Sequence, residues 1–296
     1  MKRLATLTLL VSLLTPAASA LDGAWTASMR DDRDHINFNL TTGQGSNQGM
    51  TLTLAAFTSL TPSQIYATTM TPVNFEMRRE AGTISYEGTF RNGKGAGQFT
   101  FAPDRTYIDK IRALGLTFEL NERRRHRENH TEEDDLFTCA FRDVSTAYIR
   151  SMQAIGYKTS FAKYLTMRIF NITPEYVREM ESLGFKLDED DIVTSKIHGV
   201  TPTYIREMRA AGFTKQDFDD FVAFRIHGVT MTFIRELHEL GYDNISADDL
   251  VAMRIHGVTP AFIRELRGAG YEHVPIQKMV DMRIHGVDAR YLKAMN

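Results

Sequence analysis

The spacing of the hydrophobic residues changes about a third of the way along the chain. From Leu21 to Pro103 apolar and polar residues alternate, as in residues 36–40 (INFNL) and 98–101 (QFTF). Strict alternation is typical of strands with one buried face. Six such segments, separated by turns rich in glycine and asparagine, predict a small antiparallel β sandwich or a partly open barrel.

From Asp104 onwards the spacing becomes helical, and a repeat of 28 or 29 residues organises it. Four full copies begin at Thr173, Thr201, Thr230 and Thr259, and each pairs a phrase like TPTYIREMRAAGF with a later IHGV. Residues 145–172 form a degenerate copy. Residues 104–116 carry the first half of another, whose second half lies at 131–144 beyond a charged insertion. A period of this size predicts a repeat architecture.

Each copy contains the signals that begin and end two helices. In the second full copy Thr201 is a helix N-cap followed by Pro202, and Gly212 provides the left-handed residue after the helix end. A second helix is predicted from Asp217 to Gly228. Because one pair of short helices cannot bury its apolar face alone, neighbouring pairs must stack. The sequence therefore predicts an α+β protein in which the β domain precedes an α-solenoid of two-helix repeats.

The first twenty residues predict export. Lys2 and Arg3 precede an apolar stretch, and Ala18-Ser19-Ala20 matches a signal-peptidase site. We expect a signal peptide at 1–20, the β domain at 21–103, a divergent first repeat with the charged insertion at 104–144, and tandem repeats at 145–296. No later segment approaches the roughly 20 apolar residues of a spanning helix, so we expect a periplasmic or secreted protein without a transmembrane segment.

Composition and motifs favour binding over catalysis. The 35 basic and 37 acidic residues give a net charge of −2, which does not suggest a nucleic-acid partner. The lone Cys139 excludes an internal disulfide, and its apolar neighbours predict burial. The sequence has no nucleotide-binding loop, G-x-S-x-G elbow or H-E-x-x-H motif. We therefore expect no catalytic residues, no metal site and no cofactor.

Histidines recur in the IHGV phrase at intervals of 29 residues: His198, His227, His256 and His285. Stacked helices lie about 8–10 Å apart, which is too far for equivalent histidines to share one metal ion. A histidine at the end of a helix can interact with its negative dipole instead, so a structural role is predicted. A row of histidines could also confer pH sensitivity.

Two arginine positions recur, and they are the candidate partner-binding residues. One is held by Arg206, Arg235 and Arg264, the other by Arg225, Arg254 and Arg283. Recurrence within an array favours a role between stacked repeats, and we expect pairing with the acidic doublets Asp190/Asp191, Asp219/Asp220 and Asp248/Asp249. The alternative is a charged ladder along a groove that grips an acidic or extended partner.

The phrases RIHGVTP and YIREMRAxG[FY], over Ser145 to Val287, resemble the C-terminal repeats of some BlaR1-like membrane metallopeptidases. The chain lacks the membrane helices and the H-E-x-x-H motif of those enzymes, so the resemblance implies an envelope-associated sensing or interaction module without peptidase activity. We expect a protein-interaction or scaffold module that binds a protein partner. The alternatives are a small-ligand or polysaccharide-binding β domain with a helical spacer, favoured by an aromatic pocket near Trp25, and an enzyme of an unrecognised type.

Overall fold

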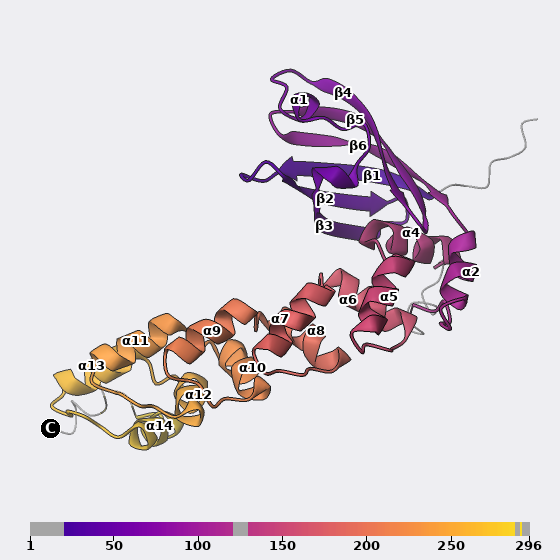
Figure 1. The fold of residues 1–296 in the computed structure, drawn as a ribbon. Coiled ribbons are helices and arrows are strands. Elements are labelled where there is room, and N and C mark those ends of the chain that lie inside the picture. The colour runs from indigo at the N-terminus through magenta and orange to yellow at the C-terminus, as the bar shows by residue number, and fades with distance from the viewer. Residues whose placement is uncertain (1–20, 121–129, 288–290, 292–296) are drawn as a thin grey trace, which may run out of the picture. The chain divides into compact units, whose positions relative to one another are not determined.

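The computed structural model describes residues 21–120, 130–287 and 291 (Figure 1). The predicted signal peptide and most of the charged insertion lie outside these residues. The chain forms two compact units. The first comprises residues up to Gln153 together with Ser160–Leu165, and the second comprises Ala154–Thr159 and the chain from Thr166 onwards.

The first unit contains a six-stranded antiparallel sheet, which confirms the predicted antiparallel β domain. Its strands lie in the order β3-β2-β1-β6-β5-β4. Their bounds are β1 (Leu21–Met29), β2 (His35–Thr42), β3 (Asn47–Thr53), β4 (Thr71–Arg79), β5 (Gly82–Arg91) and β6 (Lys94–Pro103). All these strands belong to one sheet, so of the two predicted arrangements, a sandwich or a partly open barrel, the sandwich is wrong.

A single sheet encloses an aromatic core because it curls on itself. Phe38 on β2 and Phe75 on β4 are separated by three strands in the sheet, yet their ring centroids lie 6.2 Å apart. Trp25 on β1 lies 5.4 Å from each of these two rings. Each half of the sheet thus covers the apolar face of the other. The alternating pattern predicts that one face of each strand is buried, but it does not determine whether one sheet or two bury it.

Glycines provide the space for the Trp25 indole in this core. Gly97 lies opposite both Trp25 and Gly88 in the strand register. A Cβ atom on Gly88 would lie 2.7 Å from the indole ring, and one on Gly97 would lie 1.9 Å from the carbonyl oxygen of Glu87. The bare backbone lets the indole N–H donate to that carbonyl at 3.0 Å. Trp25 is therefore a core residue, with 1% of its surface exposed.

Short helices complete the first unit. They are η1 (Leu54–Ala56), α1 (Pro62–Ile65), α2 (Thr106–Arg112), α4 (Glu132–Arg142), α5 (Thr146–Ala154) and the start of α6 (Phe161–Ile169). Helix α4 packs on β1, β4, β5 and β6, and its Phe137 stacks on Phe99 with centroids 5.3 Å apart. Cys139 on the same helix is 1% exposed, which confirms its predicted burial.

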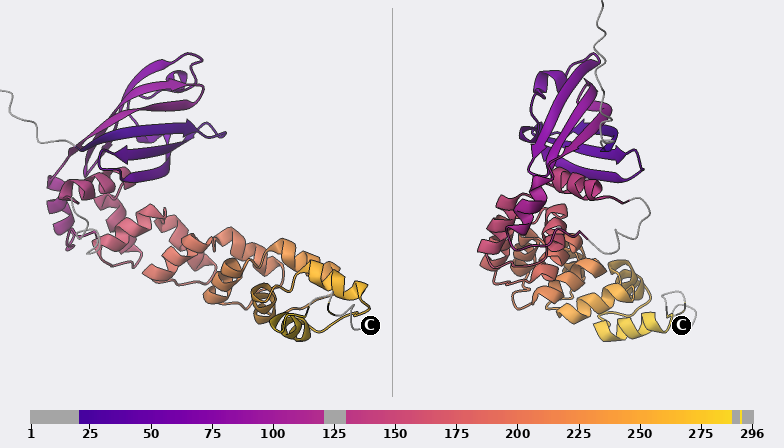
Figure 2. Two further views of the ribbon diagram at one scale, coloured as in Figure 1. Left: turned by 180° about the vertical axis from the view of Figure 1, so that it is seen from behind. Right: turned by 90° about the vertical axis from the view of Figure 1, so that its right-hand side faces the viewer.

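The second unit contains two helices in each full repeat. They are α7 (Pro174–Ser182), α8 (Glu189–His198), α9 (Pro202–Ala210), α10 (Phe218–His227), α11 (Met231–Glu239), α12 (Ala247–Ile255), α13 (Pro260–Gly268) and α14 (Ile276–Ile284). The even-numbered helices α8 to α14 contact one another in order, and α11 contacts α13. Figures 1 and 2 show the odd-numbered first helices in one row and the even-numbered second helices in another.

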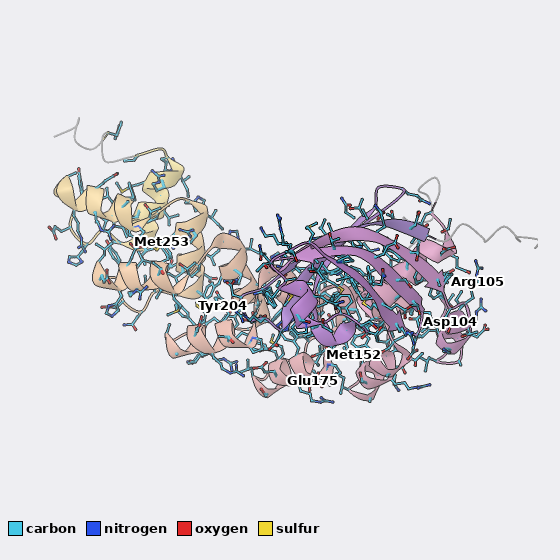
Figure 3. All side chains as sticks on the ribbon, turned by 90° about the horizontal axis from the view of Figure 1, so that it is seen from above. Asp104, Arg105, Met152, Glu175, Tyr204 and Met253 are labelled. Carbon is cyan, nitrogen blue, oxygen red and sulfur yellow. The ribbon has the colours of Figure 1, made fainter. Side chains whose placement is uncertain are left out.

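The helix boundaries follow the predicted signals. The Thr201 hydroxyl accepts the backbone N–H of Tyr204 at 3.2 Å, and Pro202 begins α9. Helix α10 ends at Gly228 in the left-handed conformation, with φ of 70°. Tyr204 of α9 and Met253 of α12, both labelled in Figure 3, are buried as the helical spacing of apolar residues requires. The predicted run of short helices is therefore confirmed.

Candidate functional site

The second helices expose a regularly repeated row of isoleucines, here called the isoleucine row. Ile197, Ile226 and Ile284 are each 54% exposed and Ile255 is 53% exposed. Successive members are 29 residues apart, one in each full repeat. At 3.6 residues per turn, Ile226 points about 160° away from the buried Phe224, because two residues rotate the helix by about 200°. The isoleucines therefore lie opposite the packed face of their helices.

The apolar surface continues from each isoleucine towards the start of its helix. On α10, Val222 and Ala223 are half-buried one turn before Ile226. On α12, Val251 and Ala252 have the same exposure and the same position relative to Ile255. Solvent-facing helix surfaces normally carry polar side chains, so a repeated apolar stripe indicates a contact surface.

Acidic side chains form a second row at the start of the same helices. This acidic row consists of Glu189, Asp190 and Asp191 on α8, Asp219 and Asp220 on α10, and Asp248 and Asp249 on α12. Burial raises the pKa of the Asp191 carboxyl, and the charges of Asp188 and Asp219 raise it further. Since Asp219 belongs to the next repeat, the negative charges of neighbouring repeats act on one another along the row.

Arg225, Arg254 and Arg283 join successive repeats. The Arg225 Nε donates to the carbonyl oxygen of His198, the last residue of the preceding second helix, at 3.0 Å. Its guanidinium also lies over the Tyr204 ring, 4.8 Å from the centroid. The next two arginines repeat both contacts, with His227 and Phe233 and with His256 and Phe262 respectively. Each arginine thus satisfies a carbonyl at the negative end of a neighbouring helix.

The other predicted arginines lie on the first helices and are exposed. The Arg206 Nη2 lies 2.8 Å from a Glu179 carboxylate oxygen, and the Arg264 Nη2 lies 3.6 Å from one of Glu236. Arg235 donates to the Thr232 hydroxyl within its own helix. The predicted pairing of the six arginines with the acidic doublets is therefore wrong. The expected role between repeats holds for five of them, but through carbonyls, rings and glutamates.

Two further arginines were missed by the sequence analysis. Arg209 Nη2 donates to the carbonyl oxygen of Leu183 at 2.9 Å, and its guanidinium lies over the Phe185 ring at 5.2 Å. Arg267 donates likewise to the Leu240 carbonyl. The signal was present, since both residues follow a repeated arginine by three positions. The third copy has His238 there instead, which hid the pattern.

Replacing Arg254 by alanine should lower the free energy of unfolding by about 1 kcal/mol, because it removes one hydrogen bond to a helix-end carbonyl and one cation–π contact. Lysine at this position should retain part of the effect, since Lys196 already lies over the Tyr176 ring at 3.7 Å in the first full copy. Arg206→Ala is the matched control and should change stability by less than about 0.5 kcal/mol, because its ion pair is exposed. Urea denaturation measures all three, and an equal loss in the two alanine variants contradicts the assignment.

The repeated histidines lie where the sequence placed them. Each precedes a glycine with φ between 69° and 72° at the end of a second helix. The backbone carbonyls of the first three accept the arginine hydrogen bonds described above. Among the described residues no cluster of three or more potential metal ligands occurs. Also within those residues, no helix combines the length and apolar character needed to cross a membrane.

The β unit has a hollow of about 540 Å³ over β4, β5 and β6. Its lining includes the polar side chains of Asn74, Glu76, Ser85, Glu87 and Gln98. Trp25 lies in the core instead, so it is not presented to a ligand. Phe75, Tyr86 and Phe99 also line the hollow, but each is at most 2% exposed, so the alternative of a ligand-binding β domain with an aromatic pocket near Trp25 stays a prediction.

No family model, no curated protein and no solved structure matches this chain. The candidate site consequently rests on the geometry of this chain: an isoleucine row and an acidic row on the second helices, and ion-paired arginines on the first.

Proposed function

We propose that the chain is an exported, periplasmic or secreted protein-interaction module whose repeats stack into an α-solenoid. The isoleucine row carries this proposal. Its four isoleucines occupy the same position of each repeat, and each is more than half exposed to water. Repeated exposure of apolar side chains lowers solubility unless a partner covers them. Covering the exposed half of each isoleucine contributes about 1 kcal/mol or somewhat more. A surface of this kind is stabilised by a bound partner.

We place the docking surface on the isoleucine row of the second helices rather than on the six predicted arginines. Arg225, Arg254 and Arg283 already contact carbonyls and rings of the chain itself. On the first helices, Arg206 and Arg264 pair with glutamates in the arrangement usual for a solvated surface. The resemblance to the C-terminal repeats of some BlaR1-like membrane metallopeptidases supports the same binding role without supplying a partner.

Photo-crosslinking tests the proposal. A benzophenone-bearing amino acid replaces Ile226 on α10 or, as the matched control, the exposed Thr203 on α9. Irradiation of cells that export the protein should give a discrete higher-mass adduct from position 226 and none from position 203. Adducts of equal yield from both positions, or none from position 226, would contradict a docking surface on the second helices.

A further inference from the structure

The isoleucine row and the acidic row run side by side along the same helices. Exposed aspartates precede the isoleucines by seven residues in three successive repeats: Asp190 and Ile197, Asp219 and Ile226, Asp248 and Ile255. Seven residues are two helical turns, or about 10.5 Å along the axis. The two rows are therefore parallel and separated by about the width of one helix, which is 10–12 Å with side chains.

The distance along the rows fits one partner helix. Helices α8, α10, α12 and α14 contact one another in order, and packed helices lie about 8–10 Å apart. A partner helix laid across them presents the same side of its surface every seven residues, about every 10.5 Å. One apolar side chain from each heptad can thus contact one isoleucine of each repeat.

The charges beside the isoleucine row determine which side of the partner helix should be basic. Burial raises the pKa values of Asp191 and Asp220, and the charges of Asp219 and Asp248 in the following repeats raise them further, so the carboxylates of the acidic row repel one another between repeats. Cations on the facing side of a partner relieve this repulsion. Arg225, Arg254 and Arg283 come one residue before Ile226, Ile255 and Ile284, so they lie level with the isoleucines along their helices and about two turns from the acidic row. These cations disfavour basic side chains of a partner at the isoleucines, whereas the acidic row favours them.

We infer that the occupant of the isoleucine row is an amphipathic helix of a partner protein, with apolar residues at heptad spacing and lysines or arginines along the side that faces the acidic row. This inference rests on the proposed function and specifies its partner. Burial of the apolar side chains provides most of the affinity, and the basic side sets the orientation and the salt dependence.

Synthetic helical peptides that span the four second helices test the inference, with fluorescence anisotropy of each labelled peptide on the full chain as the readout. The first peptide carries leucine at heptad spacing and lysine on one side. The second carries glutamate in place of the lysines, and the third keeps the lysines but replaces the leucines by serine. The first should bind about tenfold or more tightly than either of the others, which corresponds to about 1.4 kcal/mol. Its advantage over the glutamate peptide should shrink as salt is added.

Two pairs of variants test whether the lysine preference depends on the acidic row and the leucine dependence on the isoleucine row. Asp219→Asn with Asp248→Asn should abolish most of the preference for lysine over glutamate and leave the leucine dependence intact. Ile226→Ser with Ile255→Ser should weaken both leucine peptides by about tenfold. Equal binding of the lysine and glutamate peptides, or a preference that survives the asparagine pair, would overturn the inference.

The failures of the two proposals are distinguishable. A position-226 adduct in cells, combined with no preference for the lysine peptide, overturns the basic helix and leaves the docking surface in place. Concentration-dependent dimers of the chain that the Ile226→Ser and Ile255→Ser pair abolishes would identify a second copy as the occupant and overturn the partner helix.

Discussion

Replacing Ile226 and Ile255 together by aspartate is expected to weaken partner binding by about a hundredfold while leaving the fold intact. Each substitution removes apolar contact worth about 1 kcal/mol and places a carboxylate in the interface, so the pair costs about 3 kcal/mol or more. Both side chains are more than half exposed in the free chain, so they contribute little to its packing. Calorimetric titration with the partner identified by photo-crosslinking measures the loss of affinity, and a thermal melt verifies that the variant folds.

The matched control introduces the same charges on the first helices instead of the second. Thr203 on α9 and Thr232 on α11 are exposed, and aspartate at both positions should leave the affinity within about twofold of the parent. A second-helix variant that binds as well as this control would remove the isoleucine row from the binding surface.

Replacing Phe224 by alanine is expected to lower the free energy of unfolding by about 3–5 kcal/mol, whereas Ile226→Ala should lower it by less than about 0.5 kcal/mol. The two residues lie two positions apart in α10. Phe224 is fully buried, with its ring centroid 5.4 Å from that of Phe213 and 6.2 Å from that of Phe221. Ile226 faces solvent.

Urea denaturation of the two variants measures this contrast. In a stacked array each repeat is stabilised mainly by its neighbours, so the loss at Phe224 should also broaden or split the unfolding transition. Similar destabilisation by both alanine variants would mean that Ile226 belongs to the packed core and not to a docking surface.

The sequence predicted the features that depend on short-range chemistry. Thr201 and Pro202 begin α9 and Gly228 ends α10 because caps and left-handed residues act within one helical turn. The alternation of residues 36–40 identified a strand for a similar reason. Such patterns determine elements one at a time and do not fix how those elements meet.

Contacts between distant residues were not predictable in the same way. The curl that brings Phe38 onto Phe75 depends on small residues, such as Gly88 and Gly97, on strands far away in sequence. Arg225 and Arg254 contact helix-end carbonyls 27 residues earlier rather than the acidic doublets. Which of these partners lies within reach depends on how the repeats pack on one another. The exposure of Ile226, however, could have been predicted from the sequence, since a helical projection places this residue opposite Phe224.

Hydrogen–deuterium exchange of the full chain, with and without its bound partner, tests the central claim most directly. Amides in the last turns of α10 and α12, which carry Ile226 and Ile255, should exchange more slowly in the complex, while those on the exposed side of α9 and α11 should keep their rates. Protection confined to the first helices, or to the β unit, would contradict a docking surface built on the isoleucine row.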